Sequence, residues 1–306
     1  TIHNWDMLER GYTMHHAISQ DKQGNILATV SKTSAKIANG KDVRINDFII
    51  MMDPEKGEIL QEWDLVHMLD SARYGMTDYD LTSDPFAQSA SNWAHNNGIV
   101  EWGDDYLATA RYQGIFKFNK AGGIEWIISP HGYWRDKYLK LLLNPLHADG
   151  TPITDPEVIA GTKTCDDFEW PWGCHTAVPL PNGHILYFNN GYGRNFKLDF
   201  TDRKNIYTCG IEYEVDEVNR TVRQVWQYGK ERGAAYFTPA RSGVQYLEQT
   251  GNRLICPGMS NVLSNGNRGA RVTEVDPETQ DVVFELELED AIYQRVYRMS
   301  LYPENQ

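Results

Sequence analysis

Residues 47–63 read Asp47-Phe-Ile-Ile-Met-Met-Asp-Pro-Glu-Lys-Gly-Glu-Ile-Leu-Gln-Glu-Trp63. Two runs that mix apolar and polar residues flank a turn of Asp, Pro, Glu, Lys and Gly, which is typical of an antiparallel β-hairpin. The same pattern returns three times along the chain. The copies lie at 114–126, 211–226 and 272–286, and their turns lie at 119–123, 216–220 and 276–280. The hairpin is therefore one part of a repeated unit.

A second kind of hairpin precedes each copy. In three cases it begins at a histidine and turns at a glycine eight residues later: His16 and Gly24, His95 and Gly103, His175 and Gly183. The histidines are 79 and 80 residues apart, and a weaker fourth copy begins at Gly243 and turns at Gly251. Two hairpins per repeat give four antiparallel strands, and four such strands make one blade of a β-propeller.

The sequence thus predicts an all-β fold of the propeller type, with residues 1–306 in a single domain. Four full blades are expected at about 14–65, 93–129, 174–229 and 238–288. Residues 1–8 and 292–303 are each expected to form one strand of a further blade, and the inserts 66–92 and 130–173 are expected to cap one face. Four blades and two strands leave strand edges unpaired, so further structure is expected ahead of Thr1.

Composition and charge exclude several classes of function. The 306 residues carry 29 Lys and Arg against 42 Asp and Glu, a formal charge of −13. This acidity argues against a nucleic-acid partner, because a nucleic-acid groove needs a net basic face. A stretch of 18 apolar residues is absent from the sequence, so no membrane span is expected.

The cysteines and histidines give no pattern that is typical of a metal centre. Four cysteines (Cys165, Cys174, Cys209 and Cys256) are too few for a disulfide scaffold. Cys165 and Cys174 close a short loop and could pair if the protein is exported. The sequence has no Cys-x-x-Cys, and its one close histidine pair is His15-His16, so we expect no metal.

Three of the hairpins that begin the repeats bring a histidine and a cation to one edge. If the chain turns eight residues after the histidine, the residue at position 16 returns beside it. These partners are Lys32 for His16, Arg111 for His95, and Gly191, with Arg194 three residues on, for His175. The first strands of propeller blades line the channel, and ligands bind at its mouth. Imidazole and guanidinium groups gathered there would bind a compact oxyanion.

A second interpretation is that each of these histidines bonds a neighbouring blade. The remaining histidines (His3, His67, His131, His147 and His184) are expected to be structural or on the surface. The recurring Trp5, Trp63, Trp126 and Trp226 are expected to pack between strands.

Several motifs, in order along nearly the whole chain, resemble the bacterial PAPS-independent arylsulfate sulfotransferase family. They are Asn92-Trp-Ala-His-Asn-Asn97, Ala110-Arg-Tyr-Gln-Gly114, Cys174-His-Thr-Ala177, Phe188-Asn-Asn-Gly-Tyr-Gly-Arg194 and Val225-Trp-Gln-Tyr-Gly-Lys-Glu-Arg-Gly233. The resemblance implies a six-bladed propeller with an additional N-terminal β-domain, of which this chain covers the later blades. It also implies a periplasmic or secreted protein that forms a homodimer.

The resemblance further implies a ping-pong reaction in which a phenolic sulfate ester gives its sulfuryl group to an enzyme histidine and then to a second phenol. No cofactor is needed. The catalytic residues that it implies are His95, His175 and Arg194, and the substrate-binding ones are His16, Asn97, Arg111, Tyr112, Thr176 and Tyr297. Tyr112 departs from the family, in which a histidine is seen at this position.

The position implied for the nucleophile is not a histidine here. It falls on Asn261, with Ser260 as the alternative one residue away. Asparagine has no basic lone pair and cannot form a sulfo-imidazole. Three hypotheses stay open: a sulfotransferase with an altered nucleophile, a transferase or sulfate-ester hydrolase that uses His95 or His175, and a non-catalytic propeller that binds an aromatic anion or a protein.

Overall fold

The computed structural model describes residues 4–32, 47–73, 93–197, 201, 203–260, 265–267 and 269–289. The chain is all-β, and its strands form four antiparallel sheets, each built on a meander of four strands. Such sheets are the blades of a β-propeller, so the predicted fold class is confirmed. The chain divides into two compact units, residues 1–143 and 144–306, and each contains two of the sheets. The organisation as a single domain stays a prediction.

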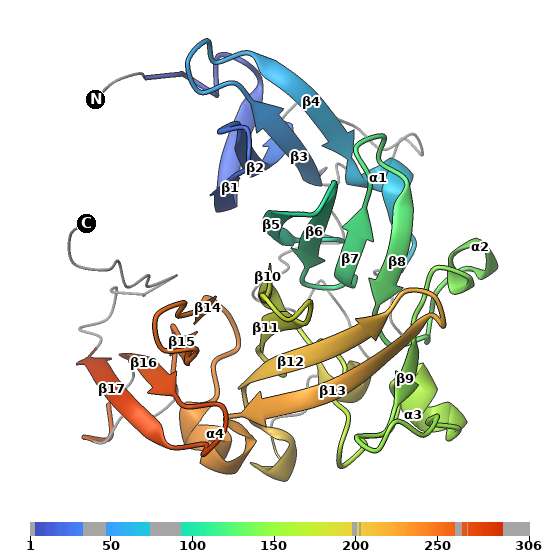
Figure 1. The fold of residues 1–306 in the computed structure, drawn as a ribbon, viewed down its shortest axis with the longest axis vertical. Helices are drawn as coiled ribbons and strands as arrows, with labels where there is room; N and C mark the ends of the chain where they lie inside the picture. Colours follow the sequence, from blue (N-terminus) through green and yellow to red (C-terminus); the bar gives the residue numbers. More distant parts are fainter. Residues whose placement is uncertain are drawn as a thin grey trace. The chain divides into compact units, whose positions relative to one another are not determined.

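The first unit contains two sheets whose strands follow chain order (Figure 1). One sheet consists of β1 (Tyr12–Gln20), β2 (Ile26–Lys32), β3 (Asp47–Met52) and β4 (Ile59–Asp64); the other consists of β5 (Asn96–Trp102), β6 (Asp105–Ala110), β7 (Gly114–Phe118) and β8 (Ile124–Ile128). Two short helices, α1 (Leu65–Met68) and α2 (Asp136–Leu139), follow the sheets. The first strands of the two sheets, β1 and β5, pack against each other.

The second unit repeats this plan with one additional strand. Its sheets are β10 (His175–Pro179), β11 (Ile185–Asn189), β12 (Cys209–Asp216) and β13 (Thr221–Tyr228), and β14 (Ser242–Tyr246), β15 (Arg253–Pro257), β16 (Gly269–Val275) and β17 (Val282–Glu289). Strand β9 (Asn144–Leu146) adds to the edge of the first of these sheets, parallel to β13. The helical segments are α3 (Pro156–Ala160), η1 (Arg194–Phe196), η2 (Arg203–Asn205), η3 (Lys230–Arg232) and α4 (Gly233–Tyr236).

The second hairpin of every sheet turns on an Asp or Asn side chain. A side-chain oxygen accepts a hydrogen bond from the backbone N–H two residues on, at 2.8 Å for Asp53, 3.1 Å for Asn119, 3.0 Å for Asp216 and 2.8 Å for Asp276. Such Asx turns fix a tight reversal without help from the rest of the fold. The repeated turn residues therefore set the ends of the third and fourth strands locally.

At three of these four turns, a tryptophan from another segment of the same unit donates a hydrogen bond to a turn residue. In the first unit, Trp63 of β4 donates its indole N–H to the Lys120 carbonyl oxygen in the next sheet's turn, at 2.9 Å. In the second unit, Trp226 of β13 donates to the side-chain oxygen of Gln280 in the next turn, at 3.1 Å. Trp5 makes the same contact with the Pro54 carbonyl oxygen at 3.1 Å, although residues 4–8 lie outside the strands. The expected strand at 292–303 lies outside the described residues.

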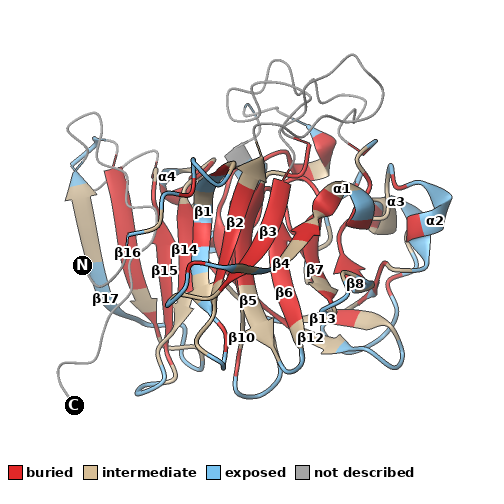
Figure 2. Cartoon of the chain, turned by 90° about the horizontal axis from the view of Figure 1, so that it is seen from above, coloured by how far each residue is buried: buried red, intermediate tan, exposed pale blue. Residues whose placement is uncertain are grey.

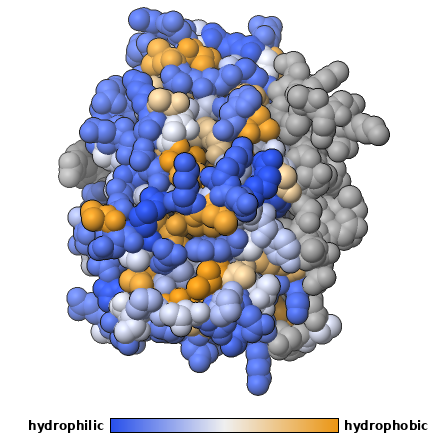
Figure 3. Space-filling model, turned by 90° about the vertical axis from the view of Figure 1, so that its right-hand side faces the viewer, coloured by the Kyte–Doolittle hydropathy of each residue, from blue (hydrophilic) through white to orange (hydrophobic). Residues whose placement is uncertain are grey.

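The middle strands of the sheets form the cores of the units. Every residue of β3 and β11 is buried, whereas β17 is mostly exposed, and Figure 2 shows β3 coloured as buried along its length. Figure 3 shows a face on which hydrophilic residues predominate and hydrophobic ones form small groups. Cys165 and Cys174 are both free thiols in this structure. The helices that the structure describes include none long and apolar enough to cross a membrane.

Gly114, at the start of β7, offers a test of this packing. Its φ is +101°, and an added Cβ would lie 2.3 Å from the Ile128 carbonyl oxygen. Gly103 also has a positive φ (+66°), but a Cβ added there would have no atom within 4 Å. We expect Gly114→Ala to lower the free energy of unfolding by about 3 kcal/mol or more, and Gly103→Ala by about 1 kcal/mol. Urea denaturation measures both, and equal losses would contradict the steric argument.

Candidate functional site

A β-bulge interrupts the first strand in three of the four sheets, at the histidines that the repeat singled out. The register shifts between Met14 and Ile18 in β1, between Asn96 and Gly98 in β5, and between His175 and Ala177 in β10. A residue other than glycine takes a positive φ in two of these bulges, His16 (54°) and Thr176 (46°), and His95 (53°) does so directly before β5. Bulges redirect side chains and are common beside active sites, and each strained residue costs about 1–3 kcal/mol.

Threonine side chains support the two bulges of the first unit. Thr29 Oγ1 accepts a hydrogen bond from Ala17 N at 3.0 Å and donates to the His15 carbonyl oxygen. Thr109 Oγ1 donates to Asn97 Oδ1 at 2.7 Å, and both side chains are fully buried. Asn97, predicted to bind substrate, thus has its amide oxygen bonded to the neighbouring strand.

Three imidazole rings form a hydrogen-bonded chain in the first unit. His15 Nδ1 lies 3.0 Å from His16 Nδ1, and His16 Nε2 lies 3.0 Å from His95 Nε2. A neutral imidazole has one N–H and one lone pair, so each contact needs a donor on one ring and an acceptor on the other. The tautomers of the three rings are therefore coupled.

A buried carboxylate lies at the His15 end of this chain. Asp47 Oδ1 is 3.7 Å from His15 Nε2, and Oδ2 accepts a hydrogen bond from the Asn96 backbone N–H at 3.2 Å. Burial raises the pKa of Asp47 to about 7, and burial lowers the pKa of His15 to about 4. Asp47 therefore holds a proton near neutral pH far more readily than an exposed aspartate does.

Arg111 lies beside His95, as the hairpin spacing predicted. The backbone N–H of Arg111 donates to the His95 carbonyl oxygen at 3.0 Å. The Arg111 guanidinium carbon lies 5.6 Å from the centre of the Tyr112 ring, which meets the His95 ring edge-on at 6.0 Å. His95, Arg111 and Tyr112 are thus brought together in this unit.

The same spacing rule is wrong for Lys32. Strand β2 pairs Lys32 with Tyr12 rather than with His16. Near the turn Gln20 pairs with Ile26, a register that by itself would place Lys32 opposite Met14, and the bulge shifts the pairing by two further residues. The Lys32 ammonium instead bonds Glu62 at 2.6 Å.

In the second unit the His175 ring is held by two acceptors. Its Nδ1 lies 2.6 Å from Asn190 Oδ1 and 3.1 Å from the Gly173 carbonyl oxygen. Asn190 cannot turn its amide around, because its Nδ2 donates to the Thr238 carbonyl oxygen at 2.8 Å. A carbonyl oxygen only accepts, so Nδ1 of His175 carries the proton and its lone pair is on Nε2.

Thr176, next to His175, carries an unsatisfied hydroxyl. The residue is buried, and within the described part of the chain its Oγ1 has no hydrogen-bond partner. In the first unit, Asn96 is fully buried, and neither polar atom of its side chain has a partner among the described residues. Buried groups of this kind are costly and suit a bound ligand.

Arg194 is buried in an ion pair. Its Nε lies 2.6 Å from Glu169 Oε1, its Nη1 donates to the Asn205 carbonyl oxygen, and its guanidinium carbon lies 3.7 Å from the centre of the Tyr207 ring. Burial alone would lower the pKa of Arg194, but Glu169 raises it. The positive charge of Arg194, which was predicted to bind the sulfuryl group, is thus already paired with the carboxylate of Glu169.

Two predicted residues, Asn261 and Tyr297, lie outside the described residues. The alternative at Ser260 is buried, and its hydroxyl donates to the Pro257 carbonyl oxygen at 3.3 Å. The sequence reasoning missed Asp47, His15 as a link in the chain, and Asn190. The motif at 188–194 contained Asn190, but its bond to His175 depends on the bulge.

A pocket of about 400 Å³ in the second unit lies at the opposite ends of these strands. It is lined by the turns after β10, β14 and β16, with Asn182, Arg253 and Asp276 among its polar residues. None of the predicted site residues lines it.

Residues 1–298 match the family model described as arylsulfotransferase (ASST), so the chain belongs to this family. It is 29% identical to the arylsulfate sulfotransferase AssT of Escherichia coli and 29% identical to that of Lelliottia amnigena. Each match covers 96% of this chain and 54% of the relative, so the chain spans about half the length of these curated relatives. A solved europium-containing methanol dehydrogenase matches 89% of this chain and 41% of its own at 12% identity, with a TM-score of 0.37.

Asp47 and His15 should give opposite contributions to the pH dependence of stability. Between about pH 4 and 7 the folded state keeps a proton on Asp47 that the unfolded chain loses, so this group weakens the fold as pH rises. Between about pH 4 and 6.5 the unfolded chain holds a proton on His15 that the folded state lacks, so this group strengthens the fold as pH rises.

We therefore expect Asp47→Asn to make stability rise more steeply with pH than in the wild type, and His15→Gln to do the reverse. Urea unfolding at about pH 4.5 and about pH 6.5 measures both slopes. Slopes that match the wild type in both variants would contradict the burial of this pair.

Proposed function

We propose that this chain belongs to an arylsulfate sulfotransferase that moves a sulfuryl group from a phenolic sulfate ester to a phenol by a ping-pong reaction. Membership of the arylsulfotransferase family supports the reaction class. The fixed tautomer of His175 carries the proposal, because a sulfuryl acceptor needs an imidazole nitrogen with a lone pair that is held in place.

In the first half-reaction His175 Nε2 attacks the sulfur of the donor ester. The N–S bond forms as the S–O bond breaks, and the leaving phenolate takes a proton. Asn190 and the Gly173 carbonyl oxygen keep the Nδ1 proton in place and stabilise the charge that develops on the ring. In the second half-reaction an acceptor phenol gives up its proton, attacks the sulfur, and releases His175.

The family resemblance implies further roles for residues of the first unit. Sulfuryl transfer resembles phosphoryl transfer, in which positioning and charge neutralisation do most of the work. His95 and His16 would exchange the phenol's proton, and Arg111 would bind the sulfuryl oxygens. Asn97, Tyr112, Thr176 and Tyr297 would complete the substrate-binding residues.

Two placements of the nucleophile compete within this proposal. The family resemblance points to position 261, where an asparagine would leave an impaired enzyme. The geometry of His175 favours that residue instead. Arg194 is already paired with Glu169, so we do not give it the role of a sulfuryl ligand.

The test is nitrophenol release from a nitrophenyl sulfate, with and without a phenol acceptor. We expect release that depends on the acceptor, and a loss of at least about a thousandfold in His175→Ala, the scale of a lost nucleophile. His67→Ala is the control, because this histidine is 81% exposed on α1. With donor alone, mass spectrometry of the quenched protein should find one SO₃ group on the peptide that contains His175.

Other outcomes would favour the competing hypotheses. Activity that survives His175→Ala and rises in Asn261→His would place the nucleophile at position 261. Release without acceptor would indicate a hydrolase. Saturable binding of the ester without nitrophenol release, in both the wild type and Asn261→His, would indicate a non-catalytic binder of aromatic anions.

A further inference from the structure

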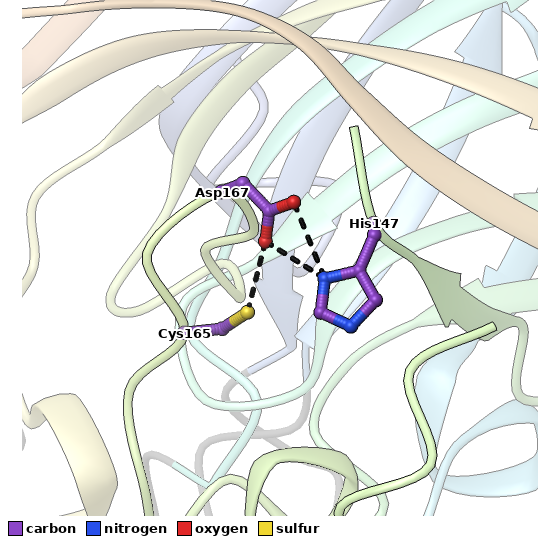
Figure 4. A group of neighbouring side chains, drawn as sticks. All are labelled: His147, Cys165 and Asp167. Atoms are coloured by element: carbon purple, nitrogen blue, oxygen red, sulfur yellow. Dashed lines mark hydrogen bonds and ion pairs between the residues drawn. The ribbon is translucent and has the colours of Figure 1, made fainter. Parts of the chain in front are cut away.

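Three side chains with metal-ligand chemistry meet in the second unit, away from the strands that carry His175. Asp167 accepts from both neighbours: His147 Nδ1 lies 3.0 Å from Oδ1 and 3.2 Å from Oδ2, and Cys165 Sγ lies 3.1 Å from Oδ1 (Figure 4). The nitrogen, sulfur and oxygen atoms all lie within 4.8 Å of one another. The sequence spacing predicted no metal site here, because the three residues fit no known motif.

The backbone holds this cluster in place. His147 directly follows β9, which pairs with β13, and its N–H donates to the Thr151 carbonyl oxygen at 2.8 Å. Asp167 Oδ2 also accepts from the Ala148 N–H at 2.9 Å. The His147 and Asp167 side chains are 40% and 38% exposed, so a cation and its water can reach them. The ligands are therefore positioned before any ion binds.

We propose that His147, Cys165 and Asp167 bind a divalent cation of the zinc class, with water as the fourth ligand. Thiolate, imidazole and carboxylate are the zinc ligands of proteins, and three of them plus water form a tetrahedral site. On binding, the Cys165 thiol loses its proton to solvent and the His147 proton moves to Nε2. One proton leaves per ion, and the two ligand charges balance the 2+ of the cation.

The present distances suit this exchange. Zinc bond lengths of about 2.0–2.3 Å place tetrahedral ligand atoms about 3.3–3.5 Å apart. The two hydrogen bonds to Asp167 Oδ1, at 3.0 and 3.1 Å, would lengthen by only a few tenths of an ångström.

The test uses the metal-stripped full chain under a reductant, titrated with Zn²⁺ and with Co²⁺. We expect one equivalent of zinc by elemental analysis, and a thiolate-to-cobalt charge-transfer band. Cys165→Ser, His147→Gln and Asp167→Asn should each weaken zinc binding at least about tenfold. His184→Gln is the matched control, because His184 pairs with Glu212 at 2.7 Å without a thiol in that hydrogen bond.

Measurements on the wild-type protein are sufficient to overturn the proposal. Less than about a tenth of an equivalent of zinc would do so, as would cobalt binding without the thiolate band. Zinc binding that is equally weakened in His184→Gln would also contradict it, because the effect would then be unspecific.

A second inference comes from the histidine chain and rests on the proposed function. We infer that His95, His16 and His15 pass the acceptor phenol's proton to Asp47. The hydrogen bonds fit two arrangements with neutral rings. In one, every N–H points toward an ionised Asp47 and His95 has its lone pair on Nδ1; in the other, every N–H points away, and Asp47 carries the proton.

These two arrangements are the start and end of one transfer. A proton taken up at His95 Nδ1 releases the Nε2 proton to His16, which releases its Nδ1 proton to His15, which releases its Nε2 proton to Asp47. All rings are neutral at both ends. The last gap of 3.7 Å must close by about 0.7 Å to form a hydrogen bond.

Asp47 is the final proton acceptor of the histidine chain, and the charged and titratable groups around it are consistent with this role. They are His15 and His16 on β1, Lys32 on β2, Glu62 and Asp64 on β4, and His95 before β5. Lys32 is paired with Glu62. A buried carboxyl with a pKa raised to about 7 can hold the proton until the product leaves.

Asp47→Asn should separate this role from catalysis in general. We expect sulfation of His175 by a nitrophenyl sulfate to keep its wild-type rate, because nitrophenol leaves without an acid. Transfer to phenols should slow at least about tenfold, most for the least acidic acceptors, and the acidic limb of its pH profile should move. If Asp47→Asn slows both half-reactions equally, or slows transfer to all acceptors alike, the relay is overturned. If the wild-type protein shows no sulfation of His175 at all, the proposed function itself is overturned.

Discussion

The β-bulge in the first strand is the constraint on which the candidate site depends. A regular strand would alternate its side chains between two faces, so neighbouring residues such as His15 and His16 could not lie ring to ring. The bulge places three residues of β1 opposite Thr29 and turns His16 toward His95. Its positive φ costs about 1–3 kcal/mol, and the Thr29 and Thr109 hydroxyls offset part of this cost with hydrogen bonds.

A second layer of buried charge supports the residues that touch the bulges. Glu169 pairs with Arg194 and accepts from the Tyr207 hydroxyl at 2.5 Å. These contacts hold the turn after β11, where a Cβ on Gly191 would lie 2.2 Å from the Tyr207 carbonyl oxygen. Asn190 lies at the start of this turn and fixes the His175 ring. Removing Arg194 would leave Glu169 buried without its cation and would weaken the contacts that hold this turn.

The sequence could predict what is local and repeated. The hairpins with Asp or Asn at the turn, the all-β class and the Arg111–His95 neighbourhood follow from spacing alone. Lys32 was misplaced because the register of β1 and β2 depends on the exact turn and on the bulge, and neither has a signal in composition. The contact between Asp47 and His15 could not be predicted, because it depends on how β3 packs beside β1 and β5. The cluster that contains Cys165 and His147 could not be predicted either, because an irregular insert brings these residues together and no sequence motif marks them.

The proposed roles of His175 and of the histidine chain differ because the groups that support their rings differ. An amide such as Asn190 neither takes nor gives a proton near neutral pH, so the neutral His175 ring keeps its proton on Nδ1 and its lone pair on Nε2. A buried carboxyl such as Asp47 can change its protonation, so the rings linked to it can reverse their hydrogen bonds together. Tautomer control by an amide suits covalent attack, and control by a titrating acid suits proton transfer. In the proposed mechanism, the group hydrogen-bonded behind each imidazole therefore determines which role that imidazole can take.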